Sequence, residues 1–241
     1  MPVIALNNRD HRQLRVSSPE SFEYLENVHM LPLVAQECGH AGNEFPVAFV
    51  KQAGTDRLQL VAIFGLREGE NLFVSDGKWQ GMYMPAIIQI EPFKLVNDAY
   101  RPDQLVAGLD TDSERVQESI GEALFDDAGN ETEFLQRVKD SLARYYQNQR
   151  YTLDFVAALT EHDLLVARDL SVRVGEQTTD ISGLHIIDEE RLNGLSEEKF
   201  AGLRKRGFLA AIYAQMLSMN QVHRLAKLKA AASLRGETPR H

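Results

Sequence analysis

The stretch that decides the fold runs from Phe45 to Phe93 and reads FPVAFVKQAGTDRLQLVAIFGLREGENLFVSDGKWQGMYMPAIIQIEPF. Short runs of apolar and β-branched residues alternate there with turn sequences, and this pattern predicts strands at 47–50, 58–66, 71–75 and about 79–84. Asp76-Gly77 is a dipeptide typical of a tight hairpin turn. The stretch therefore predicts an antiparallel β-meander, and the proline-bounded segment 86–91 that follows is predicted to be a strand edge or a single helical turn.

The rest of the chain is dominated by helical patterns. A short helix is predicted at about 32–41, and a long helix, or two broken near Asn148, at about 131–162 with Asn130 and Glu133 as a capping box. Strands are predicted at 164–174 and 183–187 around a turn-rich 175–180. A helix capped by Ser196 and a last helix over 208–229 follow. The class is therefore α+β, with an N-terminal antiparallel β-meander and a helical C-terminal half.

Three regions are expected along the chain. Residues 1–109 are β-rich, residues 110–130 form an acidic, glycine-punctuated junction, and residues 131–241 are helix-rich with a short strand pair. We expect the two larger regions to pack against each other as one compact unit.

Several segments resemble one known family. They are Gly65-Leu66-Arg67-Glu68-Gly69-Glu70, Asp76-Gly77-Lys78-Trp79, Tyr83-Met84-Pro85, Gly183-Leu184-His185 and Gly207-Phe208-Leu209. Together they resemble the bacterial SapC-like proteins, which are named after a protein associated with a paracrystalline surface layer. These motifs consist of fold glycines, turn dipeptides and aromatic residues, and none is a diagnostic catalytic signature. The resemblance covers most of the chain and implies a role in surface-layer or envelope biogenesis.

Composition indicates a soluble globular protein. The chain has 241 residues, of which 44% are hydrophobic, and this is enough to bury a sizeable core. No run approaches the ~18 apolar residues of a spanning helix, and the polar start lacks the apolar segment of a signal peptide. The single Cys38 excludes an intramolecular disulfide and fits a reducing compartment. We therefore expect a cytoplasmic protein, while the family resemblance is also compatible with leaderless export to the cell surface.

Charge is unevenly placed along the chain, which has a net charge of −9. Residues 204–241 contain eight basic residues and one acid, whereas residues 103–133 contain ten acids and only Arg115. The basic end is interpreted either as a solvated helix end or as a tail that docks on an acidic surface. Specific binding of nucleic acid is not expected. A protein partner is expected. The segment Phe208–Met219 is apolar except at Tyr213, Gln215 and Ser218, so we expect a helix buried on most sides, either at the centre of the core or as a contact for an oligomer.

The first candidate site is a ligand mouth formed by Arg67, Glu70, Trp79 and Tyr83. Arg67 could contact a carboxylate or phosphate in a bidentate manner, while Trp79 stacks on an apolar ligand. In the alternative interpretation, Arg67 pairs with Glu68 or Glu70 and Trp79 closes the core of the sheet.

The second candidate is a divalent metal site formed by His29, Glu37 and His40. Glu37 and His40 stand three residues apart on the predicted first helix, so both could face one ion. The spacing of Glu37 and His40 supplies only half of a two-metal centre, which needs a second such pair facing the same ions. The alternative is a helix-terminal histidine beside a surface carboxylate, and no cofactor is predicted in that case.

Three further groups have a catalytic and a structural interpretation. His185 and Asp188 could form a base and its orienting carboxylate, or Asp188 could cap the next helix. Cys38 could be a nucleophile near His40, or a small buried hydrophobic residue. The acidic segment 126–131 resembles a calcium loop, but its spacing favours a turn.

Taken together, these patterns favour a SapC-like protein that acts as a non-catalytic binding or assembly module. The alternative is a metal- or cofactor-dependent enzyme, or an accessory protein to a biosynthetic enzyme.

Overall fold

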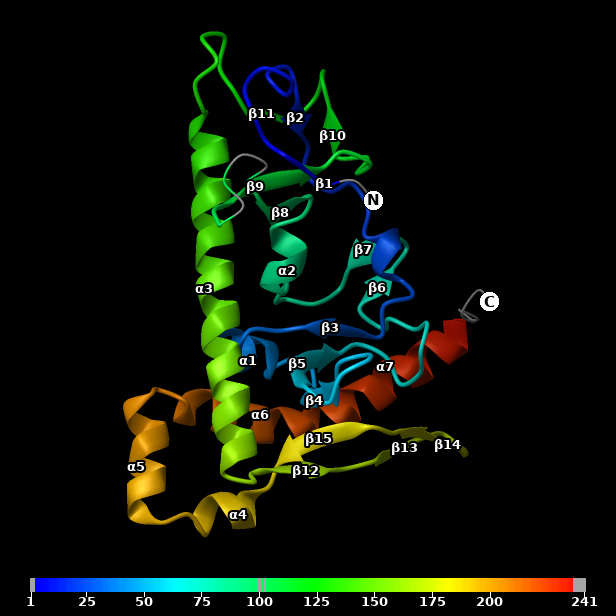
Figure 1. Ribbon diagram of the computed structural model, residues 1–241. Helices are drawn as coiled ribbons and strands as arrows, with labels where there is room; N and C mark the ends of the chain where they lie inside the picture. The colour runs from blue at the N-terminus through cyan, green and yellow to red at the C-terminus, as the bar shows by residue number, and fades with distance from the viewer. Residues whose placement is uncertain (1–2, 99–100, 102, 236–241) are drawn as a thin grey trace. The chain divides into compact units, whose positions relative to one another are not determined.

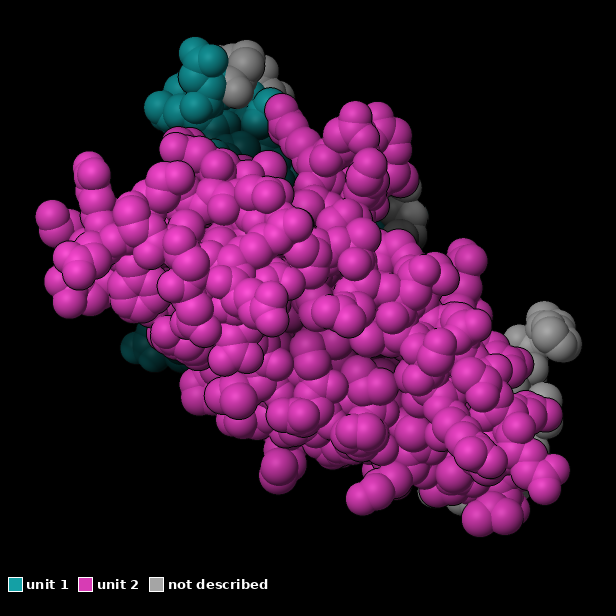
Figure 2. All heavy atoms as spheres, turned by 90° about the horizontal axis from the view of Figure 1, so that it is seen from below, with its two compact units in different colours: residues 1–20, 86–147 teal, residues 21–85, 148–241 magenta. Residues whose placement is uncertain are grey.

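The computed structural model describes residues 3–98, 101 and 103–235, and these fall into two compact units (Figures 1 and 2). Unit 1 comprises residues 1–20 and 86–147, and unit 2 comprises residues 21–85 and 148–241. These boundaries differ from those expected from the sequence, since each unit is built from two separate segments. The acidic residues 110–130 lie within unit 1 and do not separate the two.

Unit 1 is built on two small sheets beside the first half of a long helix. One sheet has the order β1-β9-β8 and the other has the order β10-β2-β11, all antiparallel. Its elements are β1 (Val3–Ala5), β2 (Arg15–Val16), α2 (Ala86–Gln89), β8 (Phe93–Asn97), β9 (Leu105–Asp110), β10 (Val116–Gln117), β11 (Glu122–Ala123) and the first half of α3 (Glu133–Glu161). Of the two alternatives predicted for the proline-bounded segment 86–91, a strand edge or a single helical turn, the four-residue α2 is the helical turn.

A small apolar core holds unit 1 together. It includes Phe93, Leu109, Leu124 and Leu135, each at most 3% exposed. Burial of such side chains is the main favourable term in folding, at about 25 cal/mol per Å² of apolar surface. The helix α3 is unbroken at Asn148, and Thr132 accepts a hydrogen bond from the Leu135 amide at its start. Asn130, which was predicted to cap this helix, instead bonds with Asp126.

Unit 2 contains a five-stranded antiparallel sheet with the order β12-β15-β4-β5-β3. The strands of unit 2, inside and outside this sheet, are β3 (Met30–Pro32), β4 (Val47–Lys51), β5 (Leu58–Ile63), β6 (Val74–Ser75), β7 (Lys78–Trp79), β12 (Leu165–Ala167), β13 (Leu170–Val174), β14 (Gln177–Ile181) and β15 (Leu184–Ile187). Strands β6 and β7 form a separate hairpin, as do β13 and β14. The predicted meander is therefore correct for β4 and β5, but β5 continues the sheet through β3 and not through β6.

The helical segments of unit 2 come from both halves of the chain. They are η1 (Glu23–Leu25), η2 (Ala35–Glu37), α1 (Cys38–Ala41), the second half of α3, α4 (Glu189–Asn193), α5 (Glu197–Lys205), α6 (Leu209–Ser218), η3 (Met219–Gln221) and α7 (Val222–Arg235). The helix predicted at about 32–41 begins at Ala35, later than predicted, because Pro32 belongs to β3. None of the helices in the described chain has both the length and the apolar composition that a membrane crossing requires.

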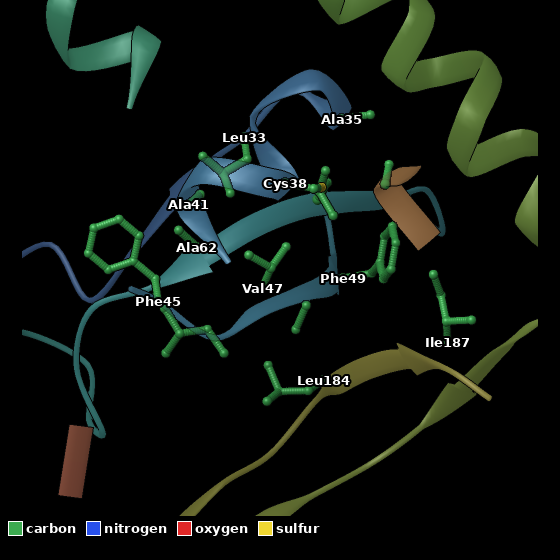
Figure 3. Close-up of a cluster of buried hydrophobic side chains, with 14 of the residues drawn as sticks. Leu33, Ala35, Cys38, Ala41, Phe45, Val47, Phe49, Ala62, Leu184 and Ile187 are labelled. Carbon is green, nitrogen blue, oxygen red and sulfur yellow. The ribbon is translucent and has the colours of Figure 1, made fainter. Parts of the chain in front are cut away.

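The core of unit 2 lies between its sheet and these helices. Figure 3 shows part of this core, in which side chains from η2, α1, β4, β5 and β15, and from residues just before η2 and β4, converge: Leu33, Ala35, Cys38, Ala41, Phe45, Val47, Phe49, Ala62, Leu184 and Ile187. Phe45 stands edge-on to Phe64 and Phe73, with ring centroids 4.9 and 4.6 Å apart. Such edge-to-face pairs contribute roughly 0.5–1.5 kcal/mol beyond their buried area.

Helix α6 completes the sheet with two polar side chains. Strand β15 pairs with β4 at Leu184 and His185, and continuing that register would place Ile187 opposite Val47. There the Gln215 amide takes the place of the backbone ladder, because it accepts from the Ile187 amide at 3.1 Å and donates to the Val47 carbonyl at 2.9 Å. Ser218 accepts from the Val47 amide at 3.0 Å. Both side chains are 0% exposed, although the sequence pattern had marked them as polar interruptions of an apolar helix.

The hairpin of β6 and β7 confirms the predicted tight turn. Asp76 and Gly77 have φ values of 50° and 68°, which is the left-handed conformation that a two-residue turn of this kind requires. A Cβ at Gly77 would also overlap with the Ser21 hydroxyl and lie 3.3 Å from the Glu23 side chain.

Replacing Gly77 with valine is expected to lower the free energy of unfolding by roughly 1–3 kcal/mol, because a β-branched residue is strained at positive φ. The measurement is denaturant unfolding followed by circular dichroism. Lys78→Val, at an exposed position of β7, is the matched control and should change stability little. An unchanged unfolding midpoint for the Gly77 variant would contradict the turn assignment.

Candidate functional site

The four residues of the expected ligand mouth have different surroundings in the structure. Trp79 is partly buried and stands edge-on to Phe64, with centroids 5.4 Å apart, and its indole N–H donates to the Tyr83 carbonyl at 3.1 Å. Trp79 thus closes the aromatic core, as the alternative interpretation stated. Arg67 is exposed. Glu70 is buried and pairs with Lys229 of α7, a partner that the sequence did not indicate.

Tyr83 belongs to a compact polar group beside α1. Its hydroxyl donates to Oε1 of Glu37 at 2.6 Å, and its ring stacks on His40 with centroids 5.7 Å apart. Burial raises the pKa of the Tyr83 phenol far above its usual value, and the Glu37 carboxylate raises it further. The phenol therefore stays protonated and acts as a hydrogen-bond donor.

Glu44 is the most informative member of this group, and it was not among the site residues predicted from the sequence. Its side chain is 2% exposed, and its two oxygens accept hydrogen bonds from the backbone amides of Met82 and Tyr83, both at 2.9 Å. Gly81 permits this approach, since a Cβ there would lie 3.0 Å from Glu44 Oε2. The sequence does contain one signal, because Glu44 directly precedes the apolar run that begins at Phe45. A carboxylate at that position is close to the core, and a buried carboxylate needs hydrogen-bond partners.

The metal hypothesis assigned His29, Glu37 and His40 to one ion. Glu37 uses its oxygens for the Val34 amide and the Tyr83 hydroxyl, while His40 stacks on Tyr83. His29 precedes β3, and its carbonyl accepts from the Phe64 amide at 2.7 Å. Across the residues that the structure describes, no three His, Cys, Asp or Glu side chains are grouped so that they could hold a metal ion.

Cys38 and His185 occupy structural positions. Burial, followed by the charge of Glu37, raises the pKa of the Cys38 thiol to about 12, so that little nucleophilic thiolate forms near neutral pH. Asp188 accepts the Arg191 amide at 2.9 Å and thereby caps α4, as its structural interpretation predicted. His185 lies in β15 opposite Phe49, and within the described part of the chain its buried Nδ1 has no hydrogen-bond partner.

The acidic segment 126–131 forms a turn. The Asp126 carboxylate accepts from the backbone amides of Ala128 and Asn130 at 2.9 and 2.8 Å. These and the Asn130 side-chain hydrogen bond lower the pKa of Asp126, with those from Asn130 as the main cause. Its carboxylate thus closes the turn.

The fold and these contacts define an α+β protein in which buried carboxylates bind the backbone of neighbouring loops. The chain belongs to the SapC family, whose model matches residues 6–225. A search of curated proteins and a search of solved structures each returned no match.

Proposed function

We propose that this protein is a non-catalytic binding or assembly module in surface-layer or envelope biogenesis, and that it self-associates through the outer face of α6. The link to the surface layer follows from the family resemblance. The observation that carries the binding role is the exposed face of α6, which presents the large side chains of Tyr213 and Leu217 to solvent.

The two faces of α6 differ clearly. Gln215 and Ser218 are 0% exposed and bind the sheet, whereas Tyr213 and Leu217, four residues apart, are 44% and 68% exposed. The sequence predicted burial of this helix on most sides, and for Leu217 that prediction is wrong. The buried face of α6 consists of Ala211, Ile212, Gln215 and Ser218, and Leu217 lies outside it. Residues four apart lie on one helix face, and aromatic side chains such as tyrosine are enriched at the centre of interfaces. A second copy of the chain presents the same face, as a two-fold symmetric contact requires.

The absence of catalysis is supported by the contacts of the candidate groups. Glu37, Glu44 and Glu70 accept hydrogen bonds from backbone amides, and Asp188 caps a helix. The enzyme alternative predicts that protein purified after metal-replete expression carries stoichiometric iron, zinc or manganese. Such a result in elemental analysis would contradict the proposal.

Leu217→Asp is expected to weaken self-association roughly tenfold or more, because a charge would be buried at the centre of the contact. Sedimentation velocity over a concentration series measures this effect. Leu153→Asp on α3 is the matched control, since that leucine is also exposed, at 64%. A wild-type chain that remains monomeric at every concentration, or equal effects of the two variants, would contradict the role of α6.

A further inference from the structure

Two buried carboxylates of unit 2 bind cations from the C-terminal helix α7. Glu70 forms an ion pair with Lys229. Glu44 Oε2 lies 3.7 Å from Arg224 Nη1, and the Arg224 guanidinium carbon lies 5.3 Å from the centroid of the Phe73 ring. A guanidinium over an aromatic face adds a cation–π attraction. The two cations are five residues apart on α7, so the helix is held at two separate points.

Each of these carboxylates also holds the backbone of a loop. Glu70 Oε2 accepts from the Leu66 amide at 3.0 Å, and Glu44 accepts from the amides of Met82 and Tyr83. The loops fix the positions of both acids through these hydrogen bonds, without any contribution from α7. The two carboxylates that α7 covers are therefore held in place by the loops, and they can accept a cation from another helix.

The apolar attachment of α7 is limited. Among its described side chains only Leu225 and Ala232 are buried, Val222, Ala226 and Leu228 pack against the core while partly buried, and Leu234 is 90% exposed. The short 3₁₀ segment η3 connects α7 to α6, and such segments often mark hinges. A helix with few buried apolar side chains is among the first elements to open locally.

We propose that α7 is a detachable latch, held by its two ion pairs together with this limited apolar contact, and that Glu44, Phe73 and Glu70 form a binding surface for a basic helix. In the closed chain α7 occupies this surface. A basic helix with arginine and lysine five residues apart can replace it when α7 opens. This inference does not depend on the α6 contact.

Native-state hydrogen exchange of the full-length chain tests the latch. In the double variant Arg224→Met and Lys229→Met, the amides of α7 should exchange about a hundredfold faster or more, because loss of the buried ion pairs makes the local opening of α7 less costly. The amides of β4 should change little, since the ion pairs hold α7 and not the sheet. Lys227→Met is the matched control, since Lys227 is exposed on the same helix. Equal acceleration in α7 and β4 would overturn the proposal.

If the double variant does not fold, the wild-type chain decides the question. Its α7 amides should exchange through an opening that depends less on denaturant than the opening of β4, since a local opening exposes less surface. Exchange of α7 only through the same global opening as β4 would show that the helix is an integral part of the fold.

A peptide in trans tests the binding surface. The probe is a fluorescent peptide with the sequence of residues 219–235, MNQVHRLAKLKAAASLR. It should bind the double-variant chain at least about tenfold more tightly than the wild-type chain, in which α7 keeps the surface occupied. The same peptide with methionine at the two cationic positions is the control. Equal affinity for both chains, or equal binding of the control peptide, would overturn the assignment of the surface.

Discussion

Replacing Gly65 with alanine is expected to lower the free energy of unfolding by about 3 kcal/mol, the upper part of the range for overpacking a core. Gly65 is buried where the chain leaves β5, and the backbone of Glu70 returns against it. A Cβ at Gly65 would overlap with the Glu70 carbonyl oxygen and lie 2.9 Å from its carbon. Because the obstacle is backbone, a side-chain rotation cannot relieve it.

Gly39→Ala is the matched control for this variant. Gly39 lies in α1, and a Cβ there would meet no atom within 4 Å. Alanine at an exposed helical position should leave stability unchanged or raise it by up to about 1 kcal/mol. Denaturant unfolding followed by circular dichroism compares the two variants. Similar midpoints for both would show that the close approach of the 65–70 loop is not present in solution.

Gln215→Met is expected to lower the free energy of unfolding by about 2–5 kcal/mol. Methionine retains most of the volume of glutamine but leaves the Val47 carbonyl and the Ile187 amide without the partners shown above. Each buried polar group left unsatisfied costs about 1–3 kcal/mol. The two strands should also separate locally, so the Ile187 amide should exchange faster with solvent.

An exposed glutamine serves as the control for Gln215. Gln149 lies on the exposed side of α3, and Gln149→Met should change stability by no more than about 0.5 kcal/mol. Thermal unfolding reports stability, and amide exchange of Ile187 reports the local effect. A Gln215 variant as stable as the Gln149 variant would contradict the bridging role of the Gln215 amide between β15 and β4.

Local patterns were sufficient where a structural feature depends on neighbouring residues. The turn at Asp76-Gly77 was predicted from its dipeptide and is confirmed by its positive φ values. Ser196 and Asp188 were predicted to cap helices, and both accept the amide three residues further on. In each case the donor and the acceptor lie within a few residues of each other, so no tertiary information was needed.

The contacts of the candidate site residues could not be predicted from local patterns, because these contacts join distant parts of the chain. Glu70 was assigned to a ligand mouth from its place on a loop, but its partner Lys229 lies 159 residues away. Glu37 and His40 were paired with a metal because they stand three residues apart, and the structure brings Tyr83 between them. Spacing along a helix says which residues share a face, but it does not say what that face meets.

The sequence by itself determined the α+β class, the family and the local turns and caps, since these depend on periodicity and on neighbouring residues. Only the tertiary structure decided how the sheet of unit 2 is ordered and which polar residues are buried. Helix α6 shows the reason. Its apolar composition predicted burial on most sides, but its buried face contains Gln215 and Ser218 because two strands need partners there, and Leu217 is left exposed. A hydrogen bond between distant segments is favourable only once the fold has brought them together, and no local pattern records it.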